Sequence, residues 1–218
     1  MKRRDFSLAA ISAATVSGLP LAAQAQGPVA KKPVEGTDYL SLDKRVPTDV
    51  GAGKIELIEF FWYSCPHCNA FESQFAAWVK AAPKDVVVQR VPVRFRDDFE
   101  AQQRAYYVFE SLNLVDAMHG KLFHAIHAER QQLNTAQALA AWANKNGLPE
   151  KKFLDTFNSF GVATKARRAT QLQDAFKVQG VPALGIAGRF YTDGSLTQTM
   201  DRALQVAEYL VGEVRRGR

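Results

Sequence analysis

The amino-acid sequence predicts one α/β domain that is interrupted by an inserted group of helices. A nearly continuous apolar run at 54–63 is typical of a central strand covered on both faces. Only helical periodicity follows from about 97 to about 161, and strand-like segments return at 183–192. The chain has 218 residues, of which 47% are hydrophobic and 23% charged. It is therefore long enough to bury a core of its own without metals or cross-links.

The first part of the α/β fold is expected over residues 39–96. Residues 39–42 can add a short edge strand before the apolar run. Next comes a helix over 69–82, stopped by Pro83. Its apolar face holds Phe71, Phe75, Trp78 and Val79. Residues 86–95 form a second strand, so that strand, helix and strand follow one another as at the start of an α/β sheet.

Residues 97–161 are assigned to the helical insertion. One helix is indicated by apolar residues spaced 3, 4 and 4 apart, which are Val115, Met118, Leu122 and Ile126. Asn134 or Thr135 can cap a second helix, and Pro149 opens a third.

Residues 162–218 are expected to complete the α/β fold. A long helix comes first, with Val162 and Ala166 on its inner face. Strands at 183–187 and 189–192 follow, joined through Gly188. A last amphipathic helix carries an apolar stripe of Met200, Ala203, Leu204, Ala207, Val211 and Val214.

Residues 1–25 have the features of a cleaved export signal, and residues 26–38 those of a flexible leader. Lys2, Arg3 and Arg4 precede a weakly apolar stretch, and residues 23–25 supply a small-x-small cleavage pattern. We expect cleavage after about Ala25 and a soluble protein in the periplasm. The paired arginines fit the twin-arginine signal and an ordinary secretory signal about equally, so the export route stays open.

The charge and the cysteine content limit the possible functions. A formal net charge of +6 comes without a run of basic residues interleaved with aromatics, so nucleic-acid binding is not expected. Only two cysteines are present, Cys65 and Cys68, and they lie in one four-residue motif. Cysteines that stabilise a fold usually close long loops, whereas this arrangement points to chemistry.

A Cys-x-x-Cys pair between a buried strand and a helix can be half of a zinc site or a redox centre. Zinc requires three or four protein ligands, and the chain has no second cysteine pair. The remaining histidines, His119, His124 and His127, are expected on exposed helix surface. No metal is therefore expected, and the redox interpretation is preferred.

The redox interpretation requires that Cys65 ionises near neutral pH, since the thiolate is the attacking species. The helix that follows directs unpaired N–H groups and the positive end of its dipole at this sulfur. His67 can add a hydrogen bond or a positive charge, and Pro66 suits the first helical turn. Cys68 lies one turn further on and is the natural resolving thiol. Because a stabilised thiolate favours the reduced form, the pair is expected to donate disulfides.

The motif Phe60-Phe61-Trp62-Tyr63-Ser64-Cys65-Pro66-His67-Cys68 resembles the active site of the DsbA family of periplasmic thiol oxidases. The similarity extends to Gly180-Val181-Pro182-Ala183 and Gly188-Arg189-Phe190, and covers about residues 38–212. It implies a thioredoxin fold with an inserted all-helical domain. It also implies that Pro182 follows a cis bond, and that Val181 and Pro182 bind an extended substrate backbone beside Cys65.

Glu59 interrupts the apolar strand, where an unpaired buried carboxylate would be costly. One interpretation is a buried acid that relays protons to Cys68; the other is a strand-end glutamate paired with a surface base. Glu72 and Arg90 match charged positions of the family near this acid. At the position of Arg90 the family commonly has lysine, so the pKa values at this site can differ from those of the family.

The resemblance further implies reduced, unfolded secreted proteins as substrates and reoxidation by a quinone-coupled membrane oxidase of the DsbB type. No cofactor is expected beyond the redox-active Cys65–Cys68 disulfide, and a monomer is expected. A disulfide isomerase or reductase of the same superfamily, a peptide-binding chaperone and an exported metal-binding protein are the alternatives.

Overall fold

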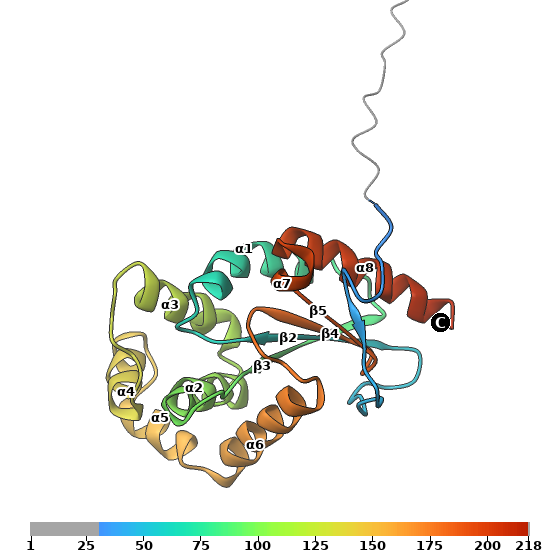
Figure 1. Cartoon of the computed structure of the whole chain (residues 1–218). Helices are drawn as coiled ribbons and strands as arrows, with labels where there is room; N and C mark the ends of the chain where they lie inside the picture. Colours follow the sequence, from blue (N-terminus) through green and yellow to red (C-terminus); the bar gives the residue numbers. More distant parts are fainter. Residues whose placement is uncertain (1–30, 218) are drawn as a thin grey trace, which may run out of the picture. The chain divides into compact units, whose positions relative to one another are not determined.

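The computed structural model describes residues 31–217, of which residues 33–217 are arranged around one five-stranded sheet (Figure 1). The expected signal over residues 1–25 and most of the expected leader lie outside the described residues. The chain divides into two units after Lys32, and the fold below is that of the second unit, Pro33–Arg218.

The sheet has the strand order β1-β5-β4-β2-β3. Its strands are β1 (Leu40–Ser41), β2 (Ile55–Phe61), β3 (Val86–Pro92), β4 (Ala183–Ile186) and β5 (Phe190–Asp193). β2 and β3 are parallel, and the remaining neighbours are antiparallel. Each strand was expected from the sequence at this place, and the parallel pair is the one linked by a helix, as parallel pairing requires.

A short 3-10 turn, Asp97–Phe99, precedes the inserted helices. The α-helices are α1 (Pro66–Ala81), α2 (Glu100–Ser111), α3 (Val115–His127), α4 (Ala136–Lys145), α5 (Glu150–Phe157), α6 (Phe160–Ala175), α7 (Gly194–Thr197) and α8 (Met200–Arg215). The first helix starts three residues earlier than expected, because Cys65 caps it and Pro66 takes its first position. The boundary placed after residue 161 falls inside α6. Within the described chain, none of these helices combines the length and apolarity needed to cross a bilayer.

Helices cover both faces of the sheet, with α1 and α8 on one face and α2 and α6 on the other (Figure 1). The side chains of β2 contribute to the apolar cores on both faces of the sheet. Ile55 and Leu57 pack toward α1 and α8, whereas Ile58 and Phe60 belong to the core on the other face. All seven residues of this strand are buried, which explains why its sequence is almost continuously apolar. Burial of each large apolar side chain contributes about 1.5–3 kcal/mol.

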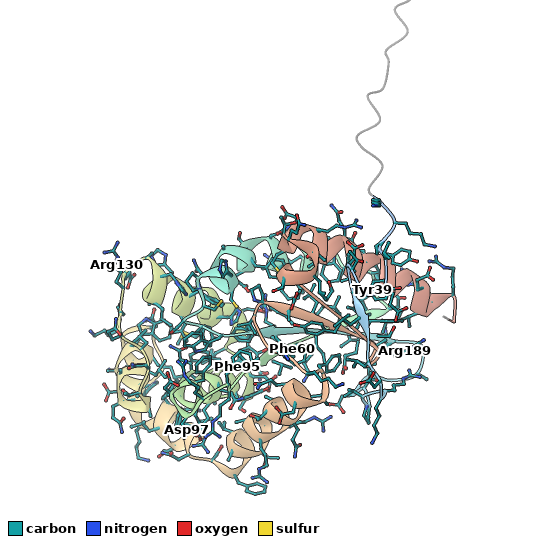
Figure 2. All side chains as sticks on the ribbon, in the orientation of Figure 1. Tyr39, Phe60, Phe95, Asp97, Arg130 and Arg189 are labelled. Carbon is teal, nitrogen blue, oxygen red and sulfur yellow. The ribbon has the colours of Figure 1, made fainter. Side chains whose placement is uncertain are left out.

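The inserted helices share their core with the sheet. Phe109 of α2 lies 6.3 Å, between ring centroids, from both Trp142 of α4 and Phe153 of α5. The same apolar cluster continues to Phe60 on the central strand, which is fully buried and is labelled in Figure 2. Thr135 caps α4 through its hydroxyl, which accepts a hydrogen bond from the N–H of Ala138 at 3.2 Å. The insertion is therefore packed onto the sheet as one continuous core.

A tight turn through Ala187 and Gly188 joins β4 to β5. The N–H of Arg189 closes this turn on the carbonyl of Ile186 at 2.9 Å, and both central residues have positive φ, 53° and 63°, as in a type I′ turn. A Cβ at Gly188 would lie 1.9 Å from the carbonyl oxygen of Val46, so only glycine fits there.

Candidate redox site

Cys65 lies where the central strand ends and α1 begins. Its backbone N–H donates to the carbonyl of Trp62 at 3.1 Å and closes a turn after the strand. As the N-cap of α1, its sulfur accepts a hydrogen bond from the backbone N–H of Cys68 at 3.4 Å. Pro66 occupies the first helical position, where a missing N–H has no cost. Sheet and helix thus direct the unpaired N–H groups of a helix N-terminus at one sulfur.

The two thiols are strongly unequal. The hydrogen bond from the Cys68 thiol is the largest cause that lowers the pKa of Cys65 to about 6, with smaller contributions from the N–H groups of Cys68 and His67 and from the His67 charge. Burial raises the pKa of Cys68 far above that of an ordinary thiol, and the neighbouring Cys65 raises it further. Cys68 is 1% exposed, whereas Pro66 and His67 lie on the surface. Near neutral pH the pair therefore holds one thiolate and one thiol.

Val181 and Pro182 lie beside this pair because of the register between β2 and β4. Phe60 pairs with Ala183 in antiparallel register, so residues just before β4 face those just after the central strand. The peptide bond between Val181 and Pro182 is cis, as the resemblance implied. The carbonyl oxygen of Val181 accepts a hydrogen bond from the Cys65 thiol at 3.4 Å.

Two depressions flank the cysteine motif. One, of about 420 Å³, is lined by His67 of α1, by Val181 and Pro182 just before β4, and by residues around Gly194 and Met200. The other, of about 380 Å³, lies toward the inserted helices, with Trp62, Ser64, Pro66, Gln102, His127 and Leu133 among its lining residues. Phe61 and Tyr63 of the motif are buried, whereas Trp62 is half-buried and lines the second depression.

Glu59 is the centre of a buried charged cluster on the α1 side of the sheet. It lies opposite Arg90 in the β2–β3 register, and its Oε2 accepts from the guanidinium Nε at 3.0 Å. The same guanidinium donates to both oxygens of Glu72 on α1, at 2.9 and 3.1 Å, and lies over the Phe75 ring. Glu72 and Arg90, which match charged family positions near this acid, thus form one hydrogen-bonded cluster with it. Glu59 is 1% exposed, and its partner is largely buried, so it is not a strand-end acid with a surface base.

Burial is the main cause that raises the pKa of Glu59 to about 8, against the lowering effect of Arg90. This carboxyl group is therefore mostly protonated near neutral pH. It also lies close enough to Cys68 to contribute to the raised pKa of that thiol. A buried acid with an available proton and a buried thiol of very high pKa thus lie near each other.

The expectation that all three further histidines lie on exposed helix surface was wrong for His119 and His127. His119 is 3% exposed and contacts the charged cluster. His127 is half-buried, and its Nε2 donates a hydrogen bond to the carbonyl oxygen of Tyr63 at 2.7 Å. His124 is exposed, as expected. One sequence signal was available for His119: it lies three and four residues before Leu122 and Phe123, on the apolar side of the helix.

These histidines do not form a metal site in the structure. Over residues 31–217, no group of three or more histidine, cysteine, aspartate or glutamate side chains could hold a metal ion. The chemistry that the site can perform with its own atoms is exchange between thiols and disulfides.

Comparison with known proteins gives consistent matches. A family model for a DSBA-like thioredoxin domain matches residues 89–205. The thiol:disulfide interchange protein DsbA of Bordetella parapertussis is 37% identical over 210 residues, which are 96% of each chain. The protein of the same name from Burkholderia cepacia is 36% identical over 182 residues, 84% of this chain and 86% of the relative. The crystal structure of Pseudomonas aeruginosa DsbA superposes with a TM-score of 0.81 at 32% identity, and covers 86% of this chain and 97% of that one.

Proposed function

Because this chain belongs to the family of DSBA-like thioredoxin domains and is a thiol–disulfide oxidoreductase, we propose that it donates the Cys65–Cys68 disulfide to reduced exported proteins. The observation that carries the direction of transfer is the inequality of the two thiols. A Cys65 thiolate with a pKa of about 6 stabilises the reduced form of the pair. Stabilising the reduced form makes the disulfide a stronger oxidant.

In the first step, a substrate thiolate attacks the Cys65 sulfur. A bond forms between the two sulfurs, the Cys65–Cys68 bond breaks, and the electron pair stays on Cys68. Because burial raises the pKa of Cys68 so far, this sulfur takes up a proton as it leaves. Glu59, with a pKa of about 8, is a protonated neighbour that can supply it and later recover one from solvent.

In the second step, another thiolate of the substrate attacks the substrate sulfur of the mixed disulfide. The substrate leaves with its own disulfide, and Cys65 leaves as the stabilised thiolate. The enzyme has gained two electrons and the substrate has lost two. No cofactor is needed for this exchange, since the two sulfurs carry the electrons.

We infer that substrates bind as extended chains across Val181 and Pro182. The carbonyl of Val181 lies within hydrogen-bond distance of the reacting sulfur, so a backbone N–H of the substrate that bonds there would place a neighbouring cysteine beside Cys65. The depression around His67, Pro182 and Met200 offers room for substrate side chains.

Export to the periplasm and reoxidation by a quinone-coupled membrane oxidase of the DsbB type complete the proposal, with the protein acting as a monomer. The signal-like residues 1–25 support export, and the relatives' name, thiol:disulfide interchange protein DsbA, supports a role in disulfide exchange. Mass spectrometry of the protein recovered from the periplasm should find a chain that starts near Gln26. A full-length chain retained in the cytoplasm would contradict this location.

The direct test uses the oxidised protein and a reduced, unfolded protein that regains activity when its disulfide forms. The wild type should restore activity stoichiometrically, whereas Cys65→Ser should restore none. Full activity of Cys65→Ser would instead favour a peptide-binding chaperone.

Equilibration with glutathione buffers separates the oxidase from a reductase. We expect a reduction potential well above that of thioredoxin, which is about −270 mV. A potential as low as that of thioredoxin would overturn the direction of transfer, although the fold would stand. Faster repair of scrambled disulfides than formation of new ones would indicate an isomerase.

A further inference from the structure

His119 is a buried titratable residue that the exchange reaction does not use. It lies on α3, in the inserted helices, and is 3% exposed. Aromatic rings from three other parts of the structure and from its own helix surround its imidazole; they are Phe61, Tyr63, Tyr106 and Phe123. A histidine in such a position needs partners for both ring nitrogens.

Both nitrogens of His119 have such partners. Nδ1 lies 2.8 Å from the hydroxyl oxygen of Tyr63, and Nε2 lies 3.3 Å from Oε2 of Glu72. Burial lowers the pKa of His119, so the ring is neutral and carries one hydrogen. Oε2 of Glu72 accepts a hydrogen bond from Arg90 and offers the ring an acceptor, so this hydrogen belongs on Nε2, and Nδ1 accepts from the Tyr63 hydroxyl.

Glu72 is one of two carboxylates that share the single guanidinium of Arg90. The other groups that face this cluster are the Cys68 thiol from α1, the Tyr63 hydroxyl from the segment after β2, the Tyr106 hydroxyl from α2 and His119 from α3. None of these four adds a positive charge near neutral pH, since a neutral imidazole, a thiol and two phenols are uncharged. Two carboxylates with one buried cation retain one proton between them, as coupled acids do.

The hydrogen bonds decide which carboxylate holds that proton. Glu59 accepts one hydrogen bond from Arg90, whereas both oxygens of Glu72 accept from Arg90 and one of them also faces the N–H of His119. Hydrogen bonds to a carboxylate favour its charged form. The imidazole thus adds to the hydrogen bonds that Glu72 accepts, and this difference favours the shared proton on Glu59.

We propose that His119 is a positioning residue that directs the shared proton of the carboxylate pair to Glu59 by donating a hydrogen bond to Glu72. The inserted helices thereby control the charge of Glu59, an acid that lies close enough to Cys68 to raise its pKa. Any effect of His119 on disulfide exchange rests on the proposed proton transfer between Glu59 and Cys68. The location of the shared proton on Glu59 does not depend on that proposed function.

A matched pair of variants separates the two nitrogens. The amide nitrogen of glutamine can take the place of Nε2, so His119→Gln retains a donor to Glu72. The amide nitrogen of asparagine, on a shorter side chain, takes the place of Nδ1. His119→Asn therefore retains a hydrogen-bonding group for the Tyr63 hydroxyl but has no donor to Glu72. The mature protein with ¹³C-labelled glutamate carboxyls is titrated by NMR, and a Glu59→Gln sample assigns the signal of Glu59.

The Glu59 carboxyl should titrate near pH 8 in the wild type and in His119→Gln. In His119→Asn its midpoint should fall by about one pH unit, since a hydrogen bond to a charged group is worth about that much. Tyr63→Phe, which leaves the Glu72 donor in place, should lower stability without moving this midpoint. Equal midpoints in folded His119→Asn and His119→Gln would overturn the proposal.

The unaltered protein provides a second test that does not depend on the folding of a variant. The ¹⁵N shifts of His119 should show a hydrogen on Nε2 and none on Nδ1 from pH 6 to pH 8. A hydrogen on Nδ1 alone would overturn the proposal. If the Glu59 midpoint moves as expected but disulfide donation has the same pH profile in both variants, the inference on His119 holds and the proton transfer to Cys68 fails.

Discussion

The sulfur of Cys65 donates a hydrogen bond to the carbonyl oxygen of Val181 at 3.4 Å, across 116 residues of sequence. This bond exists only while the sulfur carries a hydrogen. In the disulfide and in the thiolate the sulfur has none to donate, and the carbonyl is left available to an N–H of a bound peptide. The reactive states of Cys65 are thus the states in which its neighbour can accept a substrate.

Ionisation of the reduced protein should show a single thiolate. Ultraviolet absorbance should rise with a midpoint near pH 6, from Cys65, and the buried Cys68 should add no second step near the ordinary thiol value of about 8.5. Cys68→Ala removes the hydrogen bond that contributes most, so the Cys65 midpoint should rise. Two midpoints at the value of free cysteine would contradict the account of the site.

The same shift predicts how the stability of the reduced protein depends on pH. The pKa of Cys65 is lower in the folded than in the unfolded chain, so the thiolate stabilises the fold above about pH 8.5 and loses this effect as the pH falls through about 6. The oxidised protein has no such group. Urea unfolding of both forms at pH 5 and pH 8.5 should show the reduced form gaining stability relative to the oxidised form at the higher pH.

His67 should have a smaller effect on Cys65 than its place in the motif suggests. Its side-chain charge is the last of the causes that lower the pKa of Cys65, behind the Cys68 thiol and the backbone N–H groups. His67→Ala should therefore raise the Cys65 midpoint by less than about one pH unit. A rise to the free-thiol value would show that the imidazole, and not the helix N-terminus, stabilises the thiolate.

Glu59→Gln should remove a loss of stability that the wild type undergoes as the pH rises. The pKa of Glu59 is raised to about 8 in the fold, so the folded chain binds this proton more tightly than the unfolded chain does. The wild type therefore loses stability between about pH 4.5 and pH 8, by at most about 5 kcal/mol, and the glutamine variant does not. Urea unfolding across this range measures the difference. Glu150→Gln, on the exposed first turn of α5, serves as the control and should follow the wild type.

Gly188→Ala should weaken the hairpin between β4 and β5. The substitution places a Cβ 1.9 Å from the backbone oxygen of Val46, at a φ of +63°. A loss of at least about 1–3 kcal/mol in the free energy of unfolding is expected. Gly51→Ala has open space around it and should change stability by less than about 0.5 kcal/mol. Equal effects of the two substitutions would contradict the close contact.

The elements that local sequence patterns determine could be predicted. The buried β2, the helix after the cysteines and the return to strands at β4 all follow from apolar periodicity, and Glu59 was recognisable as a polar residue in an apolar strand. Helical periodicity around His119 could have indicated its burial, but its partners could not be predicted, because distant segments make its environment. Phe61, Glu72 and Tyr106 come from a strand and two helices, and no local pattern in the sequence reports their meeting.

The shared core has a consequence for any attempt to shorten this protein. Excision of α2 to α6 would leave a chain that still contains every strand and both cysteines. It would also strip the cover from Phe61 and Tyr63 and admit water to the side of Glu72 that now faces an imidazole. In such a shortened protein the pKa values of the two cysteines would change, although every residue of the motif would be retained.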